Sequence, residues 1–309
     1  MQWLPLLDTV AYTLGYIDTP PVRGEAQNEL LALVLMAQAT AQLEGGNSAE
    51  AIPLLAEAVD IATPHSPMLA AQLMGTLADI RREVEGSNYA IVEQYQAALK
   101  LLEQSELSED KAGLWLNLGI AFQEMSQGRR ATLIEAVKAY QAALYTFKKE
   151  THPELFALAQ TNLALAYLTM PMREASDQLR KGIAVQSLRE ALTVYRPDTH
   201  PEQWSSAQLN LANALQYLPS THPVENLTQA VELYEEILSM RSPINDPLGF
   251  SRIEANQANA LAHLGIFSHA KQKAQRALSV FKLYGEVDSA ESLHALLDQI
   301  AEKEQQEQA

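Results

Sequence analysis

Histidine and acidic side chains are the groups in this sequence that could carry acid–base or metal chemistry. Three of the seven histidines lie in Thr-His-Pro segments, where a loop or helix-capping role is typical: His152, His200 and His222. His263 and His269 lie six residues apart, the wrong step for two metal ligands on one helical face, and no His-Glu-x-x-His occurs. Paired acids such as Glu235 and Glu236 are typical of a solvated helix surface. We therefore predict no catalytic residues and no metal site.

Glycine and cysteine usage argues against further kinds of site. The sequence has neither a glycine-rich phosphate loop nor a Gly-x-Ser-x-Gly segment, so we predict no cofactor and no enzymatic activity. The chain has no cysteine, which removes disulfides and thiolate metal ligands and fits a reducing compartment.

Charge and hydropathy limit the partners. The chain has 22 lysines and arginines against 38 acidic residues, a net charge of −16 that repels nucleic-acid phosphates. The longest apolar run, Leu30 to Ala37, is far shorter than the roughly 20 residues of a membrane-spanning helix. The start, Met1-Gln2-Trp3-Leu4, lacks the basic flank of a secretory signal. We predict a cytoplasmic protein that binds neither nucleic acid nor membrane and favours neutral or basic partners.

The most informative feature is an internal repeat. Similar half-helices occur at 117–122, 162–167, 210–215 and 256–261. Alignment on one small residue of this segment reveals six copies, which are spaced by 39 to 48 residues: Ala39, Ala78, Gly119, Ala164, Ala212 and Ala258. Each small residue is followed by a second segment with two apolar positions seven residues apart, such as Ala136 and Ala143. Seven residues are two helical turns, so both positions share one face. Each copy is therefore predicted to be a helical hairpin.

Prolines mark where the first helix of a hairpin begins. Four of them lie eleven residues before the small residue of their repeat: Pro67, Pro153, Pro201 and Pro247. Proline is favoured in the first helical turn, where its missing amide costs nothing. Thr151 and Thr199, just before two of these prolines, are predicted to cap their helices, and Asp246 has the same predicted role.

The repeats resemble the tetratricopeptide repeat, whose pattern runs Trp, Leu-Gly, Tyr, Ala, an aromatic residue and Pro. The third copy matches best, through Trp115, Leu118-Gly119, Phe122, Ala136, Tyr140 and Ala143. The copies are longer than the commonest form of about 34 residues, and in this they are similar to repeats of kinesin light chains and bacterial scaffold proteins. The resemblance implies an all-α, right-handed solenoid of six hairpins that acts as a protein-binding adaptor.

This reading divides the chain into repeats and two ends. The predicted repeats cover residues 25–287, with boundaries at 25–66, 67–107, 108–150, 151–198, 199–244 and 245–287. Residues 1–24 are predicted to be a capping segment, because Trp3, Leu7, Val10, Leu14 and Ile17 form one apolar stripe of a helix over 3–17. Residues 288–309 are predicted to be a C-terminal capping helix that frays after Ala301.

The resemblance also suggests where a partner binds. In the tetratricopeptide family the first helices line a concave face, which would place a ladder of amides in a groove: Asn117, Asn162, Asn210, Asn213, Asn256 and Asn259, with Gln123, Gln216 and Tyr217 nearby. Amides offer both donors and acceptors to an extended peptide backbone. The alternative is that each asparagine satisfies a neighbouring helix or packs between hairpins.

Two other function classes stay open at this stage. Extra residues fall at the central turns 126–130, 170–182 and 219–223, which a solenoid would gather at one edge. These turns, or the N-terminal helix, could instead be the interface of an assembly factor or homo-oligomer. The third alternative is an enzyme or ligand-binding subunit without a recognisable motif.

Overall fold

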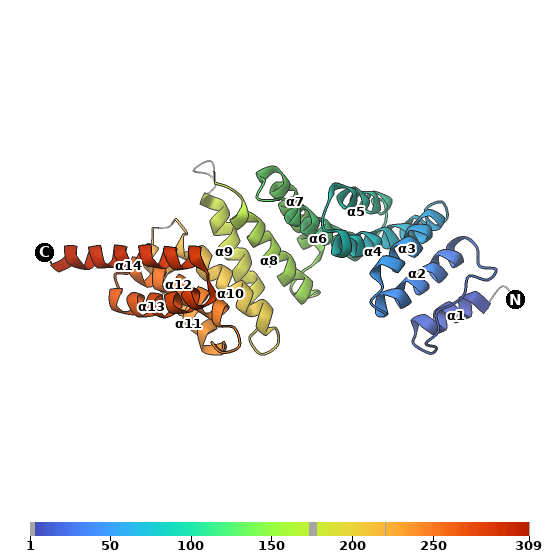
Figure 1. Ribbon diagram of the computed structural model, residues 1–309. Helices are drawn as coiled ribbons and strands as arrows, with labels where there is room; N and C mark the ends of the chain where they lie inside the picture. Colours follow the sequence, from blue (N-terminus) through green and yellow to red (C-terminus); the bar gives the residue numbers. More distant parts are fainter. Residues whose placement is uncertain (1–3, 173–177, 220, 309) are drawn as a thin grey trace. The chain divides into compact units, whose positions relative to one another are not determined.

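The computed structural model of the chain is built from α-helices (Figure 1). It describes residues 4–172, 178–219 and 221–308. Across these ranges there are fourteen helices and no strand, which confirms the all-α fold class. The helices are α1 Leu4–Thr13, α2 Asn28–Glu44, α3 Ser48–Ala62, α4 Pro67–Glu85, α5 Tyr89–Leu101, α6 Ser108–Glu124, α7 Arg130–Thr146, α8 Pro153–Thr169, α9 Gln178–Leu192, α10 Pro201–Gln216, α11 Pro223–Met240, α12 Pro247–His263, α13 Phe267–Tyr284 and α14 Val287–Gln308.

The helices form two compact units, Met1–Asn162 and Leu163–Ala309. In the first unit α2 packs on α3, α4 on α5, and α6 on α7. In the second unit α10 packs on α11, and α12 on α13. Successive hairpins within each unit also touch, as α3 touches α4 and α11 touches α12. Consecutive helices that contact one another in chain order are the packing of a solenoid, as the repeat predicts.

Small residues let the paired helices approach, as their spacing predicts. All six aligned small residues are buried. The second helices bury the apolar positions seven apart, and the larger residue between each pair is fully buried too: Leu55, Tyr95, Tyr140, Leu188 and Tyr234, with Ala274 in the last repeat. Large side chains of one helix thus fill the space beside small residues of the other, which gives the close packing of a protein interior.

The prolines begin helices as predicted, but the threonines before them do not cap. Pro201 is the first residue of α10, so His200 occupies the N-cap position and makes no side-chain cap bond. Thr199 Oγ1 instead lies 2.9 Å from the Nδ1 atom of His200, whose ring packs on Tyr195 at 5.5 Å between centroids. The capping prediction for Thr199 is therefore wrong, because a proline at the first position moves the N-cap one residue later. Asp246 does cap its helix, accepting a bond from the Gly249 amide.

The N-terminal segment differs from its prediction in length and orientation. Helix α1 ends at Thr13, because Gly15 adopts a left-handed φ of 72° and the Tyr16 amide bonds back to Ala11. The helix contacts α2, but the side chain that it buries is Thr9. Most of the predicted apolar stripe is exposed instead: Leu7 (63%), Val10 (47%), Leu14 (62%) and Ile17 (37%). Trp3 lies outside the described residues.

The C-terminal helix α14 packs on the helices before it. Ala290, Leu293 and Ile300 are buried against α13 and its neighbours, and Leu296 and Leu297 are partly buried beside them. The helix runs to Gln308, and Lys271 of α13 pairs with Glu304 within it. Fraying after Ala301 stays a prediction.

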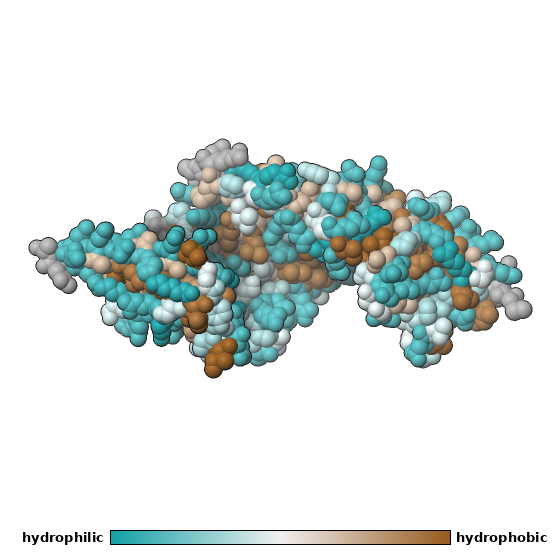
Figure 2. Space-filling model, viewed as in Figure 1, coloured by the Kyte–Doolittle hydropathy of each residue, from teal (hydrophilic) through white to brown (hydrophobic). Residues whose placement is uncertain are grey.

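On the face seen in Figure 2, hydrophilic residues dominate and hydrophobic residues gather in separate patches. Of the helices that are described, none is both long and apolar enough to cross a membrane. The described residues also contain no group of three histidine, aspartate or glutamate side chains placed to hold a metal ion. The predicted central turns 170–182 and 219–223 include residues 173–177 and 220, which lie outside the described residues.

Candidate interaction surface

The predicted groove residues all belong to first helices or to their ends. Asn117 and Gln123 lie on α6, Asn162 on α8, and Asn256 and Asn259 on α12. The remaining four lie in the second half of α10 or at its C-cap: Asn210, Asn213, Gln216 and Tyr217. All the amides are half-buried, whereas Tyr217 is 57% exposed. Hydrogen bonding separates these residues into two groups.

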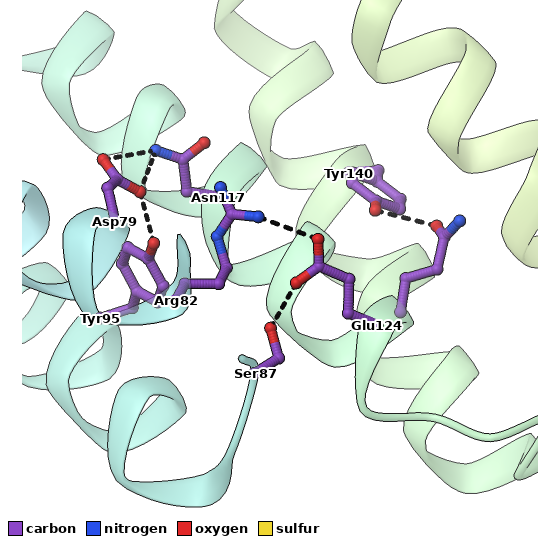
Figure 3. A network of polar contacts seen from close by, with 8 residues as sticks. Asp79, Arg82, Ser87, Tyr95, Asn117, Glu124 and Tyr140 are labelled. Carbon is purple, nitrogen blue, oxygen red and sulfur yellow. Dashed lines mark hydrogen bonds and ion pairs between the residues drawn. The ribbon is translucent and has the colours of Figure 1, made fainter. Parts of the chain in front are cut away.

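In the first unit, Asn117 is held by a polar cluster between hairpins (Figure 3). Its Nδ2 atom donates to both carboxylate oxygens of Asp79 on α4, at 2.9 and 3.1 Å. The same carboxylate accepts a hydrogen bond from the hydroxyl of Tyr95, a fully buried residue of α5. Asn117 therefore ties the third hairpin to the second, and its donor group is used inside the fold.

The cluster extends along the same two helices. Arg82 of α4 pairs with Glu124 at the end of α6 at 2.9 Å, and Ser87 donates to the other oxygen of Glu124 at 2.5 Å. The Tyr140 hydroxyl donates to the Oε1 atom of Gln123 at 2.9 Å. The side chain of Gln123, a predicted groove residue, thus also forms a hydrogen bond between the two helices of its own hairpin.

The second unit repeats this arrangement with an asparagine in place of the aspartate. Asn213 Oδ1 accepts from the Tyr234 hydroxyl at 2.7 Å and from Asn256 Nδ2 at 3.0 Å. Asn213 directly follows the small residue Ala212, as Asp79 follows Ala78. Asn256 lies two residues before the next small residue, as Asn117 does. One rule therefore describes both clusters: the polar residue after a small residue accepts from the next repeat's asparagine.

Asn162 and Asn210 occupy the same repeat position but lack such an acceptor. The residue after the preceding small residue is Ile120 for Asn162 and Leu165 for Asn210, and neither side chain can accept a hydrogen bond. Within the part of the chain that the structure describes, no hydrogen bond is found for either asparagine side chain. At this repeat position each unit thus presents a half-buried asparagine whose side chain makes no hydrogen bond, Asn162 in the first and Asn210 in the second.

Comparison with known proteins identifies the fold but no sequence relative. No protein-family model matches the sequence, and no curated protein matches it. The apo form of RapI has a TM-score of 0.56 at 11% identity, over 89% of this chain and 99% of that one. PilW, a type IV pilus biogenesis factor, has a TM-score of 0.54 at 15% identity, over 85% and 98%. A signal-transduction ATPase from Pyrococcus horikoshii with a tetratricopeptide repeat sensor reaches 0.52 at 14% identity, over 87% of this chain and 42% of that one.

The fold is a tetratricopeptide-type solenoid. At these identities the likeness concerns the fold alone, so the function must be argued from the residues of this chain.

The groups whose pKa is shifted in this fold include buried tyrosines and acidic side chains that pair between helices. Burial raises the pKa of the Tyr95, Tyr140 and Tyr234 hydroxyls, which keeps them protonated as hydrogen-bond donors. In the second unit the buried Glu254 lies 2.6 Å from Arg276, and burial raises the pKa of its carboxyl. A hydrogen bond from Lys273, with another from Gln257, lowers the pKa of Glu235. Glu254 and Glu235 thus form ion pairs with a neighbouring helix, and these pairs hold the helices together.

The Asp79 carboxyl should make stability depend on pH. Burial raises its pKa, and the Tyr95 hydroxyl and Arg82 offset this only in part. A folded pKa above the unfolded one favours folding at low pH, and that contribution is lost as pH rises through the folded value. Asp79→Asn reproduces the arrangement around Asn213 and removes the titration. Urea unfolding from about pH 3 to pH 7 should therefore show the variant gaining stability relative to wild type as pH rises. Parallel profiles would contradict this account.

Sequence reasoning missed the acceptors of these clusters. Asp79 is not singled out in the sequence analysis, although the residue after each small residue carries the relevant signal. A polar residue there, Asp79 or Asn213, coincides with a bonded asparagine in the next repeat, and an apolar residue, Ile120 or Leu165, coincides with an unbonded one.

Proposed function

We propose that this chain is a non-catalytic protein-interaction scaffold whose first helices bind an extended, neutral or basic segment of a partner protein. The observation that carries the proposal is that each unit has a half-buried asparagine on a first helix whose side chain makes no hydrogen bond, Asn162 in one and Asn210 in the other. An amide that is partly buried yet retains two donors and an acceptor is suited to pair with a peptide backbone.

The other predicted groove residues have secondary roles in this proposal. Asn117, Asn213 and Gln123 already bond to their own fold, so they position the first helices. The net charge of −16 supports a neutral or basic segment and disfavours nucleic acid. The lack of cysteine in the sequence fits action in the cytoplasm.

Affinity capture from the native lysate tests this function. Asn162→Ala and Asn210→Ala, singly and together, are expected to lose proteins that the wild-type chain retains. Each substitution removes a side-chain amide that would bond to the main chain of the partner segment. Stability should change little, since neither side chain bonds within the fold. Asn245→Ala, at an exposed loop position, is the matched control and should retain the wild-type set. If the double variant retains the same proteins as wild type, these amides are not the binding surface.

A second candidate function, self-association through the N-terminal segment, is favoured by the exposed apolar side chains of α1. Leu7 and Val10 are 63% and 47% exposed, and such a stripe is typical of a protein interface. Light scattering is then expected to give a mass above 34.1 kDa for wild type at micromolar concentration. Leu7→Gln with Val10→Gln should return the monomer mass, whereas Val22→Gln, outside the helix, should not. A wild-type monomer would exclude this function.

A further inference from the structure

A pocket of about 460 Å³ lies between α11, α12 and α13 of the second unit. A volume of this order is typical of a site for a small molecule. The part nearest the loop that joins α11 to α12 is apolar, and the part about one helical turn further along is charged. The apolar lining is Leu238, Pro243, Pro247, Phe250 and Val280, and the charged lining is Glu235, Glu254, Lys273 and Arg276. A ligand that fits both parts has an apolar body and a charged end.

Two of the four charged groups are paired with each other. Lys273 donates to Oε2 of Glu235 at 2.8 Å, and the same oxygen accepts a hydrogen bond from Gln257 at 2.8 Å. This pair joins α13 to α11 at the edge of the pocket. The groups that remain for a ligand are therefore Glu254 and Arg276.

Glu254 is only partly satisfied by the fold. The residue is 5% exposed, and its Oε1 atom lies 2.6 Å from Nη2 of Arg276. No hydrogen bond to the other oxygen, Oε2, is found in the part of the chain that the structure describes, and this oxygen is not sealed off from solvent. Because Glu254 lines the pocket, Oε2 is an acceptor available to whatever occupies it.

Arg276 presents donors beside this acceptor. Its side chain is 54% exposed, and among the described residues its Nε and Nη1 atoms make no hydrogen bond. A guanidinium group with two free N–H edges binds a carboxylate well. The pocket thus offers an anionic acceptor and cationic donors side by side.

The matching groove of the first unit shows that the repeat does not require these charges. A pocket of about 410 Å³ lies there between α3, α4 and α5. Counted from the small residues, Met74 occupies the position of Glu254, and Ala97 occupies that of Arg276. A buried ion pair is often no more stabilising than apolar residues of similar volume. The charges in the second unit therefore add a property that packing of the hairpins does not need.

We propose that the pocket between α11, α12 and α13 binds a free amino acid with an apolar side chain. The ammonium group of the ligand donates to Oε2 of Glu254, and its carboxylate accepts from Nε and Nη1 of Arg276. The apolar side chain of the ligand packs against Leu238 and Phe250. A ligand with a single charge would cover one of the two protein groups without giving it a partner, which is costly. The site contains none of the predicted groove amides, so it does not depend on the proposed function.

Titration of the full chain with L-leucine, L-methionine and L-phenylalanine, followed by isothermal calorimetry, tests the ligand class. At least one of them is expected to bind at one site per chain. For the tightest of the three, the analogue without the amino group and the analogue without the carboxylate should each bind at least about tenfold more weakly, because each loses an ion pair. An analogue that binds as tightly as its parent would contradict the assignment.

Substitutions locate the site. Glu254→Met with Arg276→Ala copies the first unit and removes both charges together, so neither is left unpaired. This double variant should keep its circular dichroism spectrum and lose at least about tenfold in affinity, and Glu254→Gln, which keeps the side-chain shape, should also bind more weakly. Arg252→Ala with Glu286→Ala, which removes another ion pair of α12, should bind like wild type. If none of the three amino acids binds, or if the Glu254 variants bind like wild type, the assignment is wrong.

Discussion

Tyr234→Ala is expected to lower the free energy of unfolding by about 3–5 kcal/mol, the range for removing a large aromatic side chain from a core. The side chain is fully buried in the second unit, between the hairpin's two helices. Its loss leaves a cavity and removes the hydroxyl that bonds to Asn213 at 2.7 Å and to Gln216 at 3.2 Å. Urea unfolding followed by far-ultraviolet circular dichroism measures the change.

Tyr234→Phe separates packing from hydrogen bonding. It keeps the ring and removes the hydroxyl, so the expected loss is about 1 kcal/mol. Asn213 would still accept from Asn256, which limits the cost. Tyr284→Ala, a half-exposed tyrosine at the end of α13, is the control in the same unit and should cost less than about 0.5 kcal/mol. Equal losses for the Ala and Phe variants of Tyr234 would mean that the ring contributes little to the core.

The parts of the fold that depend on local periodicity could be predicted from the sequence. Small residues such as Ala78 and Ala212 recur where two helices touch, and prolines such as Pro201 stand where helices begin. Both signals arise within one hairpin. They can therefore be recognised without any knowledge of how distant segments pack.

The N-terminal helix shows where periodicity alone fails. The spacing of Leu7, Val10 and Leu14 correctly indicates a helix, but spacing does not tell which surface receives that face. In the structure α1 contacts α2 through its other side. The predicted helix over 3–17 runs past the true end, although Gly15 is the residue type that adopts the left-handed conformation at a helix terminus and could have marked it.

The candidate site was only half predictable. Its residue types and positions follow from the repeat, but the state of each amide depends on a partner in the preceding repeat. Asn117 and Asn162 look identical in sequence, yet Asp79 engages the first and Ile120 cannot engage the second. A pocket of about 430 Å³ lined by residues of α12 and α14, Asn259 among them, was not predictable, since it depends on how α14 lies against α12.

Gly119→Ala is expected to lower the free energy of unfolding by about 1–3 kcal/mol, although alanine is the better helix former. A Cβ atom built at Gly119 would lie 2.6 and 2.7 Å from ring atoms of Tyr140, which is fully buried on α7. The ring cannot move aside without disturbing the core or its bond to Gln123. Urea unfolding again supplies the measurement.

Gly113, on the same helix α6, is the matched control. Apart from its chain neighbours and the nearby backbone of α6, no atom lies within 4 Å of a Cβ built there, so Gly113→Ala should raise stability by about 0.5–1 kcal/mol through helix propensity alone. The two substitutions are chemically identical and should have opposite signs. A stabilising Gly119→Ala would show that α6 and α7 do not approach as closely as the repeat pattern requires.

A double-mutant cycle assigns the effect to the ring. Tyr140→Leu copies the fourth repeat, where Leu188 is buried at the same position and Ala164 stands in the place of Gly119. In the Tyr140→Leu background, Gly119→Ala should cost less than in wild type, because the clashing ring atoms are gone. An unchanged cost would place the strain elsewhere in α6. A reduced cost would tie the repeat's glycine to the aromatic residue of the second helix, the pair on which close packing of this hairpin depends.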